Sequence, residues 1–85
     1  MPNIIMYASA LCPYCRRARA LLERKEVDYT VLDVDQDPSL WQEMEQRSGR
    51  NTVPQIFIDA VHVGGYDDLA ALDRSGQLDP LLGTG

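Results

Sequence analysis

The sequence predicts an α/β fold in which a four-stranded mixed sheet carries helices on both faces. Short apolar runs alternate with amphipathic segments in the order strand, helix, strand, helix, strand, strand, helix. A strand–helix–strand unit implies a parallel pair, whereas two apolar runs joined by a tight turn imply an antiparallel hairpin. The 85 residues are enough for one compact domain, so we expect residues 1–85 to form a single domain.

The first half of the chain predicts two strands and two helices. Residues 3–7 form a short apolar run typical of a buried strand, and residues 13–26 place apolar side chains at helical spacing among charged ones. Residues 27–33 alternate between apolar and polar and predict a second strand. Asp37 followed by proline is typical of a helix start, and this helix should end at Gly49.

The second half predicts a hairpin and a last helix. Residues 55–58 and 60–63 are apolar runs joined through Asp59. A pair of glycines at positions 64 and 65 ends the second run. Residues 66–75 then carry apolar side chains on one side and stop before Gly76, which predicts a helix.

Charge and composition exclude several classes of protein. The net charge of −5 argues against nucleic acid and anionic membranes as partners. No stretch approaches the roughly 20 apolar residues of a membrane span, and the start lacks a secretory signal, so we expect a cytoplasmic location. Five of the eight basic residues fall in one segment, residues 16–25: Arg16, Arg17, Arg19, Arg24 and Lys25. Their positive charge would attract an anionic small molecule or stabilise a thiolate.

Two cysteines, Cys12 and Cys15, lie where the first strand passes into the first helix. Unpaired amides and the helix dipole favour an anion at that position, so we expect Cys12 to be a nucleophilic thiolate. Cys15, one turn later, is placed to attack a disulfide formed at Cys12, as a less exposed resolving thiol. Two structural interpretations remain open, half of a zinc site with His62 as the one further soft ligand, or an ordinary buried pair. The strand–helix context favours redox chemistry.

Arg16 and Arg17 stand where basic residues are mildly unfavourable. Positive charge in the first turn of a helix costs about 0.3–1 kcal/mol near an exposed terminus. Residues that oppose the local preference of a helix without a structural gain indicate a functional site. The other basic residues of this segment are interpreted as a solvated helix face.

With these residues in view, the chain resembles the glutaredoxins, closest to the small bacterial dithiol glutaredoxins of the glutaredoxin-3 type. Three blocks carry the resemblance, namely Cys-Pro-Tyr-Cys at residues 12–15, Thr-Val-Pro-Gln-Ile-Phe-Ile at residues 52–58 and Gly-Gly-Tyr-Asp-Asp-Leu at residues 64–69. The resemblance implies the thioredoxin fold, Cys12 and Cys15 as catalytic residues, and glutathione as co-substrate. It implies no bound cofactor and no metal.

The resemblance also implies the glutathione site. Pro54 would be cis, which leaves the backbone of Val53 free to pair with the cysteinyl part of glutathione. Amides near Tyr66 and Asp67 would hold the γ-glutamyl carboxylate, with Asp68 near its ammonium. The remaining expected contacts are Tyr14 beside the substrate, Thr52 in the proline block, and Gln55 and Arg16 near the glycyl carboxylate.

One position departs from the family pattern. Glutaredoxins commonly have a lysine three residues before the first cysteine, where this chain has Ser9. We expect this substitution to weaken glutathione binding or the stabilisation of the thiolate, rather than to abolish function.

The predicted activity is the reduction of protein–glutathione mixed disulfides and protein disulfides through Cys12, with Cys15 as resolving thiol. The expected partners are glutathione and disulfide or glutathionylated proteins, and the expected state is a monomer. Three alternatives stay open. They are a dithiol carrier reduced by a thioredoxin-type reductase, a dimer that binds an iron–sulfur cluster with glutathione, and a regulatory domain without turnover.

Overall fold

The computed structural model describes residues 2–83 of the chain. Met1 and residues 84–85, which the expected domain includes, lie outside the described residues. The elements follow in the order β1 (Ile4–Ala8), α1 (Pro13–Arg24), β2 (Thr30–Asp33), α2 (Pro38–Ser48), β3 (Gln55–Ile58), β4 (Val61–Gly64), α3 (Tyr66–Arg74) and α4 (Leu78–Leu82).

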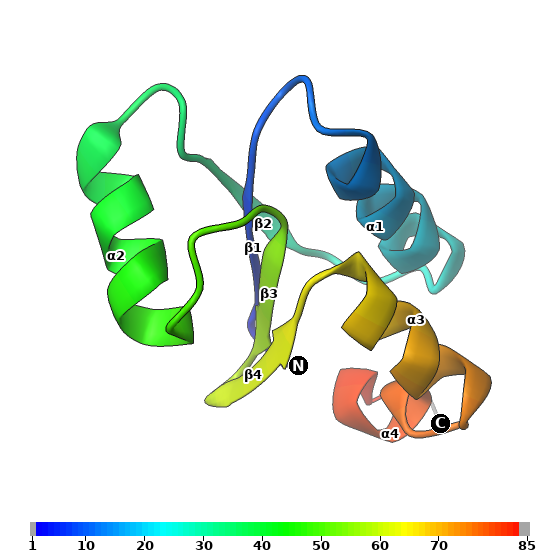
Figure 1. The fold of residues 1–85 in the computed structure, drawn as a ribbon. Coiled ribbons are helices and arrows are strands. Elements are labelled where there is room, and N and C mark those ends of the chain that lie inside the picture. Colours follow the sequence, from blue (N-terminus) through cyan, green and yellow to red (C-terminus); the bar gives the residue numbers. More distant parts are fainter. Residues whose placement is uncertain (1, 84–85) are drawn as a thin grey trace.

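The four strands form one mixed sheet in the order β2-β1-β3-β4. β1 and β2 are parallel, and β3 is antiparallel to both β1 and β4. Helix α2 covers one face of the sheet, while α1, α3 and α4 lie on the other (Figure 1). The arrangement confirms the predicted mixed sheet with helices on both faces, and it is a thioredoxin fold.

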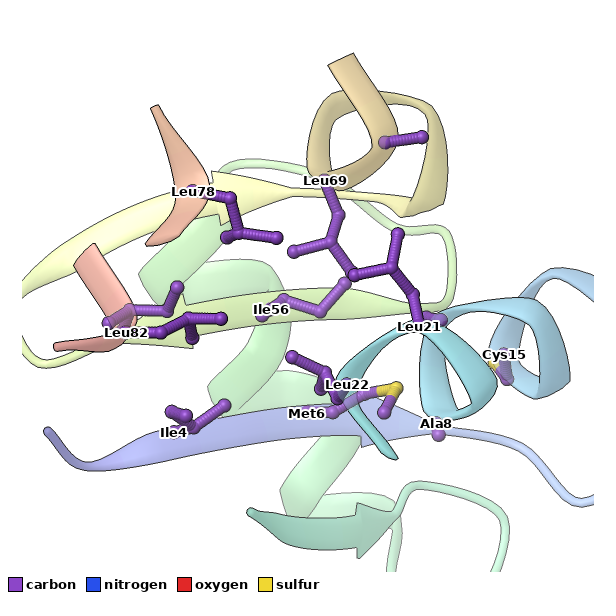
Figure 2. Packing of buried hydrophobic residues seen from close by; sticks show 13 residues of the cluster. Ile4, Met6, Ala8, Cys15, Leu21, Leu22, Ile56, Leu69, Leu78 and Leu82 are labelled. Atoms are coloured by element: carbon purple, nitrogen blue, oxygen red, sulfur yellow. The ribbon is translucent and has the colours of Figure 1, made fainter. Parts of the chain in front are cut away.

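Alternation along β1 divides the core between the two faces. Ile4, Met6 and Ala8 are buried on the side of α1, α3 and α4, where Figure 2 shows them together with Leu22 and Ile56. The intervening positions contribute to a second cluster under α2, formed by Tyr7, Val34, Met44 and Phe57. This period of two is what a strand buried on both faces requires.

The predicted boundaries are wrong at β2. The strand begins at Thr30 rather than at residue 27, because its parallel partners in β1 begin at the Ile5–Thr30 pair. Residues 27–29 instead follow a left-handed turn at Glu26, whose φ is 58°. Val27 and Tyr29 still pack against the core, which explains their apolar character.

Helix α4 is absent from the predicted order. It is five residues long and contains a proline, so it is too short to show a helical period. Its role is nonetheless plain in Figure 2, where Leu78 and Leu82 close the core beside Ile4 and Ile56. Across residues 2–83, none of the helices combines the length and the apolar character needed to cross a bilayer.

Candidate active site

Cys12 caps the N-terminus of α1, four residues beyond the end of β1. Its Sγ accepts a hydrogen bond from the backbone N–H of Cys15 at 3.1 Å. Pro13 occupies the first helical position, where no N–H is needed. The sulfur therefore lies against the positive end of the helix dipole, which favours negative charge on it.

Cys15 faces the interior, one turn along α1, and only 2% of its surface is exposed. Burial, followed by its hydrogen bond with Cys12, raises the pKa of the Cys15 thiol to about 12. Cys15 is therefore a neutral thiol at physiological pH, whereas Cys12 is partly exposed. An exposed sulfur at a helix start, with a protonated sulfur behind it, suits a nucleophile and a resolving thiol.

The loop before β3 lies beside Cys12 in space. The Val53–Pro54 peptide bond is cis, as the resemblance implied. The Cys12 thiol donates to the carbonyl oxygen of Val53 at 3.7 Å. This contact brings the backbone of residue 53 to the reacting sulfur, where a substrate strand would have to pair.

A second helix N-terminus meets the same loop. Gly65 is the N-cap of α3, and a Cβ at this position would lie 3.4 Å from the carbonyl oxygen of Pro54. Asp68 closes the helix start, because its Oδ2 accepts from the N–H of Gly65 at 3.0 Å. The same oxygen accepts from Nη1 of Arg50 at 2.9 Å. The Arg50 guanidinium, and next the Gly65 amide, hold the pKa of Asp68 below its usual range.

These segments enclose a groove of about 210 Å³. Eight of the nine predicted glutathione-binding residues line it: Tyr14, Thr52, Val53, Pro54, Gln55, Tyr66, Asp67 and Asp68. Tyr14 and Tyr66 stand near one another, with ring centroids 6.4 Å apart. The groove therefore runs between the two helix N-termini and holds polar groups suited to an extended, charged small molecule.

Two predicted contacts fit the geometry less well. Arg16 is exposed and lies outside the groove lining. Gln55 lines the groove but is 1% exposed, and its amide is occupied internally. Its Nε2 donates to the carbonyl oxygen of Thr52 at 3.0 Å, and its Oε1 pairs with Nε2 of His62 at 2.8 Å. Gln55 thus braces the proline loop.

Arg50 was missed by the sequence reasoning and lines the groove. It follows the glycine that ends α2, and its charge is isolated from the basic segment of α1. The available signal was its position two residues before the Thr-Val-Pro block. Among the residues that line the groove, it is the single cation.

His62 packs as a structural residue, as expected. Its ring stacks on Phe57 with centroids 4.8 Å apart. Burial, and next the charge of Arg50, hold the pKa of His62 below its usual range. It is therefore a neutral hydrogen-bond partner for Gln55 at neutral pH.

Ser9 does not replace the charge of the family's lysine. Its Oγ donates to the carboxylate of Asp35, in the loop that follows β2. The side chain thus ties two loops together beside α1. Within residues 2–83, no three or more His, Cys, Asp or Glu side chains gather as a metal site would require.

Comparison with known proteins points in one direction. The glutaredoxin family model matches residues 4–63. Glutaredoxin 3 of Escherichia coli is 56% identical over 82 residues, which covers 96% of this chain and 99% of that protein.

Solved structures agree. The glutaredoxin of Brucella melitensis is 55% identical, with a TM-score of 0.86 over 100% of this chain and 92% of that one. A buckwheat glutaredoxin–glutathione complex is 28% identical, with a TM-score of 0.89 over 96% of this chain and 77% of that one.

Proposed function

This chain belongs to the glutaredoxin family of glutathione-dependent thiol–disulfide oxidoreductases, and we propose that it reduces protein–glutathione mixed disulfides through Cys12. The observation that carries the proposal is the difference between its two thiols. The sulfur of Cys12 accepts a hydrogen bond from a helix amide and contacts the carbonyl oxygen of Val53, which lines the groove, while the thiol of Cys15 is buried, with its pKa raised to about 12. Only Cys12 is poised to attack an incoming disulfide.

The groove supports a definite orientation for glutathione. The cysteinyl part lies along the backbone of Val53, which already reaches the sulfur of Cys12. The γ-glutamyl end then lies at the start of α3, where free amides suit its carboxylate and Asp68 suits its ammonium. The known buckwheat complex with glutathione supports the choice of ligand.

The cycle needs no metal and no bound organic group. The Cys12 thiolate attacks the glutathione sulfur of a mixed disulfide, and a new S–S bond forms as the old one breaks. The protein thiolate leaves with the electron pair of the broken bond and takes a proton from water. A second glutathione thiolate attacks the glutathione sulfur on Cys12, which releases oxidised glutathione and restores Cys12.

A protein disulfide follows a second route. Cys12 forms a mixed disulfide with the substrate, and Cys15 attacks Cys12 as it gives up its proton. The products are a reduced substrate and a Cys12–Cys15 disulfide, which two glutathiones return to the dithiol. Cys15 is needed on this route alone.

The test is steady-state reduction of a glutathionylated peptide with glutathione as the sole donor. Wild type and Cys15→Ser are expected to turn over, and Cys12→Ser is expected to be inactive. Cys15→Ser is the matched control, because it removes a thiol of the same helix turn. If wild type works only when a thioredoxin-type reductase supplies electrons, the dithiol-carrier alternative replaces this proposal.

The proposal extends to location and assembly. Regeneration of Cys12 requires abundant reduced glutathione, as in the cytoplasm, and we propose that location. We also propose a monomer, because the groove and both thiols come from one chain. Sedimentation of the reduced protein with glutathione tests this, and a coloured dimer would favour the cluster-binding alternative.

A further inference from the structure

Charge is divided unevenly around the reacting sulfur. Residues 16–25 contain five basic residues and one acidic residue, a charge of +4, while the rest of the chain has three basic and twelve acidic residues, a charge of −9. The described ion pairs of residues 2–83 involve Lys25 and Arg50 and leave Arg16 and Arg17 without a carboxylate within 4.0 Å. Both arginines are exposed. The protein therefore presents uncompensated positive charge within two turns of Cys12.

Apolar surface adjoins this charge. Leu11, immediately before Cys12, is 87% exposed, and Tyr14 is 51% exposed. The guanidinium of Arg17 lies over the ring of Tyr14, 5.3 Å from its centroid. A large exposed apolar side chain beside stacked aromatic and guanidinium groups is typical of the centre of a binding surface.

The geometry of disulfide exchange brings the protein half of a mixed disulfide close to this surface. Glutathione fills the groove on the side of Val53, so its sulfur lies between Cys12 and the departing sulfur. Exchange proceeds with the sulfurs of Cys12, of glutathione and of the substrate protein roughly in line. The protein half of the substrate therefore lies outside the groove, over the exposed start of α1. Leu11, Tyr14, Arg16 and Arg17 form the exposed start of α1 and the residue before Cys12, and we call them the docking patch.

We propose that the docking patch binds the protein half of the mixed disulfide and selects segments with carboxylates and an apolar residue close to the reacting cysteine. This inference rests on the proposed function. Charge complementarity carries it, because the patch is positive whereas the remaining surface is strongly negative and repels acidic partners. Tyr14 serves both the groove and the patch, so the two halves of the substrate meet at its ring.

The experiment uses two glutathionylated peptides that differ only in the residues flanking the cysteine, two aspartates against two lysines, with a leucine in both. The mixed disulfide of cysteine and glutathione is the probe without a peptide. For wild type, kcat/KM is expected to be about tenfold higher for the acidic peptide at low salt. That ratio should fall to about twofold at 0.5 M salt, because screening shortens the range of the charges.

Variants locate the effect. In Arg16→Gln/Arg17→Gln, the ratio between the two peptides should fall to about twofold at low salt. Arg24→Gln/Arg74→Gln is the matched control, since it removes the same two charges from exposed positions at the C-terminal ends of α1 and α3, and it should keep the wild-type ratio. A third glutathionylated peptide, with serine in place of the leucine, tests Leu11. The ratio of kcat/KM between the leucine and the serine peptide should be about threefold lower in Leu11→Ser than in wild type.

The outcomes distinguish failure of the docking patch from failure of the proposed function. Equal rates on both peptides, with normal turnover of the small mixed disulfide, overturn the docking patch and leave the proposed function intact. An equal loss of selectivity in Arg24→Gln/Arg74→Gln also overturns it, because overall charge would then explain the preference. Failure to turn over the small mixed disulfide overturns the proposed function, and the docking patch falls with it.

Discussion

Gly64 is held in a conformation that a side chain should not tolerate, and replacing it with alanine tests the geometry at the start of α3. Its φ is +115°, and a Cβ built there would lie 2.3 Å from Oδ2 of Asp68. The backbone alone should cost about 1–3 kcal/mol. Displacing Asp68 also loses the hydrogen bond that closes α3, about 0.5–2 kcal/mol. The expected loss for Gly64→Ala is therefore about 1.5–5 kcal/mol.

Urea unfolding followed by circular dichroism measures this loss. With a slope of about 1 kcal/mol/M for so small a chain, the midpoint should fall by about 1.5–5 M. Gly76→Ala is the matched control, because Gly76 has a φ of +78° and nothing within 4 Å of its built Cβ. It should lose about 1–2 kcal/mol, the backbone part alone.

A double-mutant cycle identifies the contact responsible. In an Asp68→Ala background the two closest clashing atoms are gone, so Gly64→Ala should cost only its backbone part, about 1–3 kcal/mol. Strict additivity of Gly64→Ala and Asp68→Ala, together with equal costs for Gly64→Ala and Gly76→Ala, would refute the close approach of Asp68 to residue 64.

Other outcomes follow from the same contacts. Iodoacetamide at pH 7.5 should label native protein once, at Cys12, because burial raises the pKa of Cys15 to about 12; two labels under native conditions would contradict this. In the unfolded chain the Cys15 thiol loses its proton near pH 9, whereas in the folded protein it keeps the proton to about pH 12. Between pH 9 and 12, the free energy of unfolding of wild type should therefore fall faster than that of Cys15→Ser, by up to about 1.4 kcal/mol per pH unit. Below pH 9 the two should show no such difference. Burial and Arg50 lower the pKa of His62, so its NMR titration midpoint should lie below 6.5 and rise in Arg50→Met; an unchanged midpoint would remove Arg50 as a cause. Leu78→Ala should cost about 2–5 kcal/mol in urea unfolding if α4 closes the core, and a loss below 1 kcal/mol would contradict that role.

Much of the site could be predicted because its chemistry is encoded locally. The spacing of Cys12 and Cys15 and the proline between them determine a helix start, and the helix start determines which sulfur is favoured as an anion. The Cys-Pro-Tyr-Cys block, the proline block and the Gly-Gly-Tyr-Asp-Asp block together predicted eight of the residues that line the groove.

The rest depends on contacts between distant segments. Arg50 matters because it reaches Asp68, 18 positions away, and nothing near it in the sequence indicates that partner. Gln55 stands in the block that resembles the glutaredoxins, yet its side-chain amide is bonded to Thr52 and His62, and the bond to His62 depends on the register of β3 and β4. Helix α4 is too short to show a period and is specified by burial of its leucines.

The ion pair between Arg50 and Asp68 affects the electrostatics of glutathione binding. In the free protein Asp68 already has a positive partner, so an arriving ammonium replaces one cation with another. Binding in the proposed orientation is then an exchange at Asp68, in which one ion pair is lost as another forms. Added salt weakens both pairs alike. The contribution of the ammonium to glutathione affinity should therefore vary little with ionic strength, and the salt dependence that remains should come from the carboxylates of glutathione.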